Sequence, residues 1–118
     1  MSDLALESDA LPGDLQAWEE LVVVKLGGAT LADNEPVLVE IASQVQRRSL
    51  VLVHGGGRRL SDWLERLGVE SRFEGGLRVT DDAALEAALA VFGGLVNGEL
   101  VAALNSVGVA AAGLTGID

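Results

Sequence analysis

Short apolar runs divide the chain and predict its β-strands. Three runs are rich in β-branched residues, and each is too short to form a helix of ordinary length. Runs of this kind are typical of strands that are buried on both faces of a parallel sheet. The three expected strands cover residues 21–24, 50–53 and 109–114.

Apolar residues three and four positions apart predict amphipathic helices between and after these strands. We expect four helices, at residues 35–48, 58–68, 80–94 and 95–108. Their expected core-facing residues are, in chain order, Val37, Leu38, Ile41 and Val45; Leu60, Trp63, Leu64 and Leu67; Leu85, Leu89 and Phe92; and Val96, Leu100 and Leu104.

Local signals add detail to these helices. Thr80 is the expected N-cap of the third helix, because a threonine hydroxyl can accept a hydrogen bond from an unpaired backbone N–H. Asp62 and Arg66 are spaced to pair on the outer side of the second helix. Asn97 and Asn105 are expected to face solvent or to bond locally within the fourth helix.

Residues 69–80 predict a β-hairpin, because two short polar–apolar runs flank Glu74, Gly75 and Gly76. The alternation of the other strands with helices predicts an α/β fold, with a parallel sheet and right-handed crossovers. Each expected strand ends in glycines, in the segments KLGG, HGGG and GLTG. Ligands of such folds bind in the crevice beyond the carboxyl ends of the strands, so three bare loops there favour a binding site over three ordinary turns.

Charge is concentrated at the start of the chain. The net charge is −10, and residues 1–20 carry six acidic side chains and no basic one, which predicts a solvated acidic arm. No basic stripe runs along the rest of the chain, and aromatic residues make up only 3% of it. Nucleic acid is therefore not expected as a partner, because the chain has few side chains for phosphate neutralisation or base stacking.

The composition excludes other classes of function. The chain has no cysteine, so disulfide bonds and thiolate chemistry are ruled out. No apolar run approaches the roughly 20 residues of a membrane span, and the first residues lack the basic start of a signal peptide. We therefore expect a cytoplasmic protein without membrane contact.

Lys25 is the only lysine of the chain. It follows an apolar strand and precedes Gly27 and Gly28, so its ammonium group is expected at the mouth of the crevice. A compact charge with rotatable donors suits a phosphoryl group in transfer. The alternative is a strand-end lysine that reaches into solvent.

The HGGG segment offers backbone N–H groups at the start of a helix. Gly55, Gly56 and Gly57 would expose N–H groups that can bind a carboxylate or a phosphate. The segment is not a Walker loop, and Leu60 stands where G-x-G-x-x-G has its third glycine. His54 has no cysteine or second histidine with which to hold a metal, so its ring is expected to shape the loop.

Arg78 lies on the expected hairpin just before a helix. Its guanidinium can clamp a carboxylate through two parallel hydrogen bonds, although a surface arginine would fit the position equally well. Asp81 and Asp82 are expected as charges of the first helical turn, and no metal site is expected.

Five segments together resemble the amino-acid kinase family, and within it the acetylglutamate kinases. They are VVVKLGG, LVLVHGGG, EGGLRVTD, GLVNGELV and AAGLTGID, in the family's order and approximate spacing. The resemblance implies a parallel-sheet, three-layer α/β sandwich that is incomplete at its C-terminal side. It also implies ATP-dependent phosphorylation of the side-chain carboxylate of N-acetyl-L-glutamate to an acyl phosphate, the second step of arginine biosynthesis, with ATP and Mg²⁺. A homo-oligomer is expected.

The resemblance carries roles onto this sequence. Lys25 would stabilise the phosphoryl transition state, Gly56 and Gly57 would bind the substrate through backbone N–H groups, and Arg78 would grip its α-carboxylate. The loops that would support these residues contain Gly27, Gly28, His54 and Gly55.

The same resemblance gives the expected domains. Residues 1–20 would be the acidic arm and residues 21–118 the N-terminal, substrate-binding lobe, with the family's C-terminal ATP-binding lobe absent. We therefore expect the isolated chain to be inactive. Alternatives stay open: a non-catalytic acetylglutamate-binding or assembly module, a sister kinase acting on a carrier-linked aminoadipate or glutamate, or self-association through an exposed sheet edge.

Overall fold

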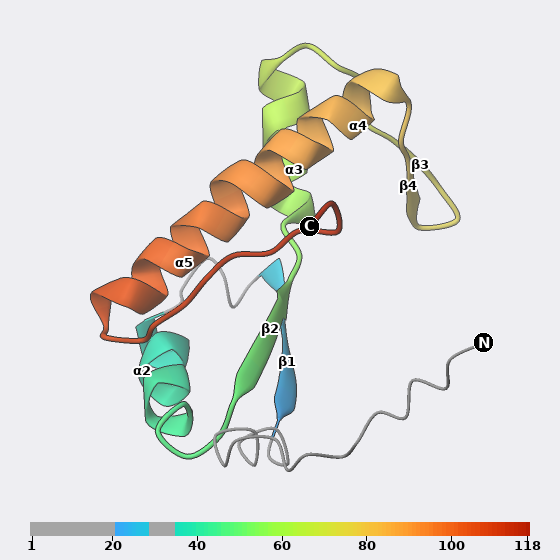
Figure 1. Ribbon diagram of the computed structural model, residues 1–118. Helices are drawn as coiled ribbons and strands as arrows, with labels where there is room; N and C mark the ends of the chain where they lie inside the picture. The colour runs from blue at the N-terminus through green and yellow to red at the C-terminus, as the bar shows by residue number, and fades with distance from the viewer. Residues whose placement is uncertain (1–20, 29–34) are drawn as a thin grey trace, which may run out of the picture.

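The first two strands of the chain form a two-stranded parallel sheet. The structure is a computed structural model that describes residues 21–28 and 35–118, so the acidic arm lies outside the described residues. Strands β1 (Val22–Leu26) and β2 (Leu50–His54) pair in parallel, and helix α2 (Glu35–Gln44) comes between them along the chain (Figure 1). The register runs from Val22 opposite Leu50 to Leu26 opposite His54. The first two expected strands and the α/β class are confirmed.

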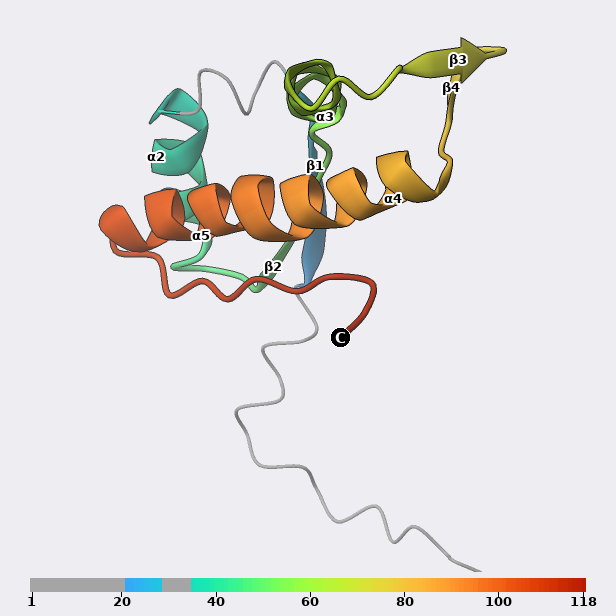
Figure 2. The ribbon, with the colours of Figure 1, turned by 90° about the horizontal axis from the view of Figure 1, so that it is seen from above.

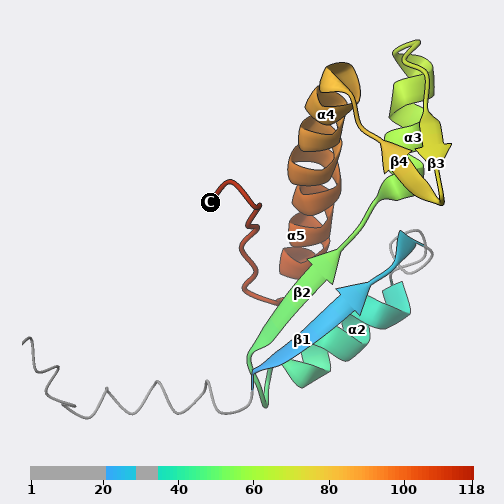
Figure 3. The same ribbon diagram turned by 90° about the vertical axis from the view of Figure 1, so that its right-hand side faces the viewer.

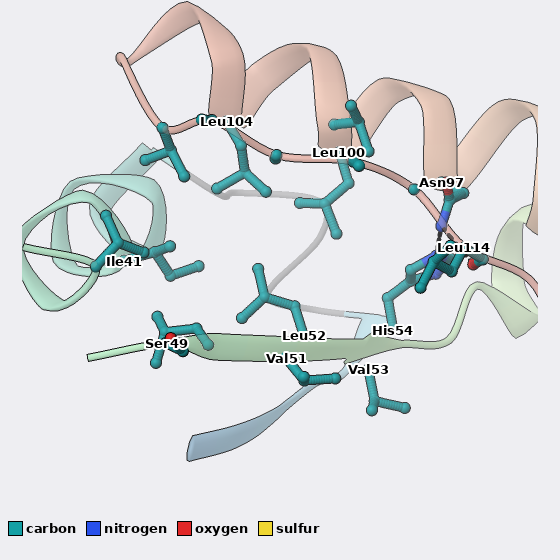
Figure 4. Close-up of a pocket in the computed structure, with 18 of the residues that line it drawn as sticks. Ile41, Ser49, Val51, Leu52, Val53, His54, Asn97, Leu100, Leu104 and Leu114 are labelled. Carbon is teal, nitrogen blue, oxygen red and sulfur yellow. Dashed lines mark hydrogen bonds between the residues drawn. The ribbon is translucent and has the colours of Figure 1, made fainter. Parts of the chain in front are cut away.

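The two faces of this sheet differ in burial. Val24, Leu26 and Leu52 lie in a core cluster to which α2 contributes Leu38 and Ile41. On the opposite face, the side chains of three valines remain exposed, by 63, 44 and 47%: Val23, Val51 and Val53. Alternate residues of a strand point to opposite faces, and in Figure 4 Val51 and Val53 point away from the helical side while Leu52 points towards it. Among the described residues, the helices therefore cover one face of the sheet.

The expected third strand, residues 109–114, is wrong. This segment pairs with no strand and runs back beside the last helix (Figure 1). Its first N–H groups are satisfied by that helix instead, because Val109 N–H donates to the carbonyl oxygen of Leu104 at 3.0 Å and Ala111 N–H donates to Asn105 Oδ1 at 3.1 Å. A cavity of about 690 Å³ lies between the segment, the last helix and β2.

The two helices expected at 80–94 and 95–108 form one continuous helix (Figures 1 and 2). It consists of α4 (Asp82–Ala88), a π-helical stretch η2 (Leu89–Val96) and α5 (Asn97–Ser106). A π-helical turn holds an extra residue, and the spacing of buried positions widens from three or four to five across η2. The buried positions are Ala84, Ala87, Val91, Val96, Leu100 and Leu104.

This change of spacing explains which predicted core positions are right. Val96, Leu100 and Leu104 are buried as expected, because they all follow the widened step. Leu85 and Leu89 are 49 and 52% exposed, so these two positions of the stripe predicted for the first half are wrong. Phe92, the third position, is partly buried and packs against a core cluster as expected. The N-cap is also shifted by one residue from Thr80: Asp81 Oδ1 accepts from Ala84 N–H at 2.9 Å.

The length of the continuous helix must be compared with the expectation that no apolar segment of the chain is long enough to cross a membrane. Asp82–Ser106 is 25 residues long with a mean hydropathy of 1.7 over its most apolar window, which is enough to cross a membrane by length and composition alone. Core helices of globular proteins pass the same test, and this helix contributes to both core clusters. It is therefore weak support for a membrane span.

Helix α3 (Gly57–Arg66) begins after Gly55 and Gly56, which follow β2, and packs against the long helix through Leu60 and Leu64. Two predictions for this helix are wrong: the burial of Leu67 and the pairing of Asp62 with Arg66. Leu67 is 59% exposed, because the helix has ended by that residue. Arg66 stacks over the ring of Trp63, with its guanidinium carbon 4.4 Å from the ring centre. Arg59–Glu99 is the one ion pair among the described residues, so none joins Arg66 to Asp62.

The predicted hairpin is confirmed beside α3 (Figure 3). Strands β3 (Arg72–Glu74) and β4 (Leu77–Val79) pair in antiparallel register around Gly75 and Gly76. Both glycines have positive φ angles, +57° and +79°, as a tight two-residue hairpin turn requires.

Candidate functional site

The loop of three glycines, Gly55–Gly57, connects β2 to α3; we name it the triglycine loop. Its middle residue, Gly56, is buried and has a φ angle of +146°. A Cβ on Gly56 would lie 3.1 Å from Val96 Cγ2 and 3.2 Å from Phe92 Cδ1. Gly56 is therefore required by the backbone conformation and by close packing against the long helix.

Close packing does not require glycine at Gly55 or Gly57, on either side of Gly56. A Cβ on Gly55 or Gly57 would meet no atom within 4 Å, and both residues are exposed. Bare, exposed backbone at the start of a helix leaves N–H groups that an anion can approach. Of the two glycines predicted to bind substrate, Gly57 is exposed, whereas Gly56 is covered by η2.

Arg78 of β4 lies against the triglycine loop, 21 residues away along the chain. Its Nη2 donates to the carbonyl oxygen of Gly57 at 3.2 Å and to Ser61 Oγ at 2.7 Å, and its Nη1 donates to Ser71 Oγ. The guanidinium carbon also lies 4.7 Å from the centre of the Phe73 ring. Described residues thus accept hydrogen bonds from three of the five N–H groups of the guanidinium. These bonds hold the positive charge of Arg78 next to the start of α3.

Ser61 connects this arginine to the helix itself. Its hydroxyl accepts from Arg78 and donates to the carbonyl oxygen of Gly57 at 3.1 Å. Sequence reasoning missed this serine, although it follows Gly57 by four positions and so shares a helix face with it. Ser71 and Phe73 were also missed, because their role depends on how the hairpin folds back on α3.

Lys25 lies on β1, one position before the pair formed by Leu26 and His54. Its side chain is exposed, and the alternation along the strand places it on the face opposite Val24 and Leu26. No described residue forms a hydrogen bond or an ion pair with it. The structure thus brings Arg78 into contact with the triglycine loop. It puts Lys25 on β1, the strand paired with β2, and the two cations do not contact each other.

Gly27 and Gly28 follow β1 and are exposed, and a Cβ on either would meet no atom within 4 Å. The carbonyl oxygen of Leu26 accepts a hydrogen bond from Gly55 N–H at 3.4 Å. This bond holds the beginning of the triglycine loop beside the end of β1, so the two glycine-containing loops start next to each other.

His54 contacts the loop on one side and the long helix on the other. Its Nδ1 lies 2.9 Å from the carbonyl oxygen of Gly55, and its Nε2 lies 3.1 Å from Nδ2 of Asn97 on α5 (Figure 4). Asn97 also donates to the carbonyl oxygen of Leu114 at 3.3 Å. The expectation of a local or solvent-facing Asn97 is therefore wrong, and no sequence signal joins residues 43 positions apart.

The cavity beside β2 is separate from the triglycine loop. His54 and Asn97 lie at one end of its lining, which contains neither Lys25 nor Arg78. Most of the lining is aliphatic, which suits packing better than the binding of a charged ligand. In the described part of the chain, no three histidine or acidic side chains gather into a metal site.

The chain belongs to the amino acid kinase family, whose sequence pattern matches residues 20–118. An acetylglutamate kinase of Dehalococcoides mccartyi is 47% identical over 104 residues, covering 87% of this chain and 38% of the relative. An acetylglutamate kinase of Nostoc punctiforme is 44% identical over 116 residues, covering 94% of this chain and 39% of the relative. The resemblance found in the sequence is thereby confirmed, and the chain spans about two fifths of the length of these relatives.

A solved structure shares the fold. It is the N-acetylglutamate synthase of Neisseria gonorrhoeae, complexed with coenzyme A and N-acetyl-glutamate. The similarity has a TM-score of 0.55 at 28% identity and covers 75% of this chain and 22% of that one. The family match and this structural similarity together support an α/β architecture of the amino acid kinase type for this chain.

Proposed function

We propose that this chain forms the substrate-binding part of an acetylglutamate kinase, a cytoplasmic enzyme of arginine biosynthesis. The reaction would transfer a phosphoryl group from ATP to the side-chain carboxylate of N-acetyl-L-glutamate. The names of the relatives support this substrate. The observation that carries the proposal is the contact of Arg78 with Gly57, because a guanidinium group beside exposed backbone at the start of a helix suits a carboxylate ligand.

We assign the proposed roles to Arg78, the triglycine loop and Lys25. Arg78 has two N–H groups beyond those engaged by Gly57, Ser61 and Ser71, one on Nε and one on Nη1. A fork to the α-carboxylate would form when Nη2 exchanges its bond to the Gly57 carbonyl oxygen for one to the substrate. The backbone N–H groups of Gly57, which is exposed, and of Gly56, which is buried, would hold the substrate near the transferring phosphoryl group. Lys25 would neutralise charge on that group, since phosphoryl transfer depends on positioning and charge stabilisation more than on covalent work by the protein.

The hairpin would shield the product. An acyl phosphate is readily hydrolysed, so exclusion of water from the site protects it. Phe73 and Leu77 are 55 and 76% exposed on the hairpin, and Arg78 ties this hairpin to α3. These apolar side chains would cover the bound substrate from the side of the hairpin.

ATP and Mg²⁺ are proposed as ligands of the complete enzyme. The described residues offer no cluster of side chains for the metal, so none of the steps proposed for them passes through it. We propose that the chain alone binds acetylglutamate without phosphorylating it. A non-catalytic binding or assembly module is the second candidate.

Calorimetry with N-acetyl-L-glutamate tests the proposal. Arg78→Ala is expected to weaken binding about 10- to 100-fold, since hydrogen bonds to charged groups contribute about 1.5–3 kcal/mol. Arg78→Lys should restore only part of the affinity, because an ammonium group lacks the fork. Arg72→Ala, on the paired strand of the same hairpin, is the matched control and should bind normally. An intact chain that does not bind acetylglutamate would contradict the proposal.

Addition of ATP separates the two candidates in the complete protein, since the chain alone is expected to bind acetylglutamate without turnover under either of them. A complete kinase should consume ATP only when acetylglutamate is present, and Lys25→Ala should abolish this consumption. A binding module should retain acetylglutamate affinity and show no response to ATP. Turnover by the chain alone, lost in Lys25→Ala, would contradict the expected inactivity of the isolated chain.

A further inference from the structure

Asn97 joins three segments that lie far apart in the sequence. From α5 it reaches His54 at the end of β2 and the carbonyl oxygen of Leu114 in the last segment (Figure 4). Gly113 makes this position possible, because a Cβ on Gly113 would lie 1.9 Å from Asn97 Oδ1. Any other residue at position 113 would displace the amide.

The hydrogen bonds of Asn97 determine where the proton of the imidazole ring lies. An amide nitrogen donates and does not accept, so Asn97 Nδ2 must donate to a His54 Nε2 that carries no proton. The proton of a neutral imidazole is then on Nδ1, which lies 2.9 Å from the carbonyl oxygen of Gly55. Both contacts of the ring are satisfied by this one tautomer.

The bond from His54 to Gly55 has a consequence for the triglycine loop. The carbonyl group of Gly55 and the N–H group of Gly56 belong to one planar peptide unit and point in opposite directions. Holding the carbonyl oxygen therefore fixes the direction of the next N–H.

We propose that Asn97 is a positioning residue of the triglycine loop. It holds His54 in the Nδ1–H tautomer, and through this ring it orients the peptide unit between Gly55 and Gly56. Asn97 touches neither the loop nor a substrate, and its effect passes entirely through His54. The consequence for acetylglutamate binding rests on the proposed function, whereas the effect on the ring and the loop does not.

The imidazole ¹⁵N spectrum tests this directly, because His54 is the only histidine of the chain. In the full chain at neutral pH, we expect a protonated Nδ1 and an unprotonated Nε2. Asn97→Leu removes the donor, so the ring should gain the Nε2–H tautomer and the amide signals of Gly56 and Gly57 should shift. Asn97→Asp keeps the shape but can only accept, so both ring nitrogens should become protonated.

Asn105→Leu is the matched control. Asn105 lies on the same helix and also holds the last segment, through its bond from Ala111 N–H, but it does not contact His54. This variant should leave the ring spectrum and the amide signals of the loop unchanged. Gly113→Ala, which displaces the Asn97 amide by another route, should reproduce the ring spectrum of Asn97→Leu.

Acetylglutamate affinity provides the functional readout. Asn97→Leu should weaken binding about tenfold, while Asn105→Leu should bind as the unaltered chain does. If the unaltered chain does not bind acetylglutamate, the proposed function fails and the ring spectrum still decides the role of Asn97. A protonated Nε2 in the unaltered chain would overturn the inference, even if Asn97→Leu did not fold. So would a ring spectrum and loop signals that do not respond to Asn97→Asp.

Discussion

Arg59 on α3 and Glu99 on α5 form an ion pair with two parallel hydrogen bonds, each 2.9 Å long. The pair joins two helices whose residues are 40 positions apart. The hydrogen bond from Arg59 lowers the pKa of Glu99, and the same bond raises the pKa of Arg59. Both side chains are about half exposed, so solvent screens much of their attraction.

The pair should make stability depend on pH at acidic values. Because the pKa of Glu99 is lower in the folded state, its stabilisation is present above the ordinary value of 4.5 and is lost as the pH falls through the folded pKa. Glu99→Gln should therefore lower the free energy of unfolding by at most about 1 kcal/mol at pH 7, and by less at pH 3. Urea titrations at both pH values measure this. Glu86→Gln, on the same long helix, should show a smaller effect at pH 7; equal effects would contradict a stabilising role for the pair.

Asp81 should stabilise the start of the long helix. Its carboxylate accepts from Ala84 N–H, so Asp81→Ala should cost about 1 kcal/mol of the free energy of unfolding. Thr80→Ala is the control, because Thr80 stands outside the cap. Thermal denaturation of the two variants compares them, and a larger loss in Thr80→Ala would show that the cap lies one residue earlier.

Gly56→Ala should destabilise the fold more than Gly57→Ala. The first substitution places a Cβ against Val96 and Phe92 at a φ angle that side chains rarely adopt, a strain of about 1–3 kcal/mol. The second meets no atom within 4 Å and should leave the free energy of unfolding nearly unchanged. Chemical denaturation measures both. A stable Gly56→Ala variant would mean that the loop does not need the conformation described.

Gly98→Ala should stabilise the protein. Gly98 lies inside α5, and a Cβ there would meet no atom within 4 Å. Alanine is favoured over glycine in a helix by roughly 0.8–1 kcal/mol, and the melting temperature should rise accordingly. Gly108→Ala provides the contrast, because Gly108 has a φ angle of +83° after the helix and alanine should be destabilising there.

The sequence predicts elements whose signals are local. The strands β1 and β2, helix α2 and the hairpin around Gly75 and Gly76 follow from apolar runs, periodicity and turn residues that lie within each element. The strand expected at 109–114 fails because a strand also needs a partner. Its first N–H groups are taken by the end of α5, and apolar composition alone cannot reveal this competition.

Some residues of the candidate site are likewise indicated by local sequence signals, and others depend on tertiary packing. The glycines, Lys25 and Arg78 stand out by residue type and spacing, and the contact between Arg78 and Gly57 agrees with grouping them. Their roles in catalysis and binding stay predictions. Ser61 could have been found from its helical spacing, whereas Asn97 could not, because its meeting with His54 depends on the packing of α5 over β2.

The π-helical stretch sets the direction in which the second half of the long helix faces. One residue corresponds to about 100° of rotation around a helix axis, so the extra residue within η2 turns everything that follows it. Asn97 and Glu99 lie immediately beyond η2, and one faces His54 while the other faces Arg59. The backbone of η2, which contains neither residue, therefore sets the direction around the helix axis in which Asn97 and Glu99 point. Deletion of one residue from η2 would rotate both side chains away from their partners.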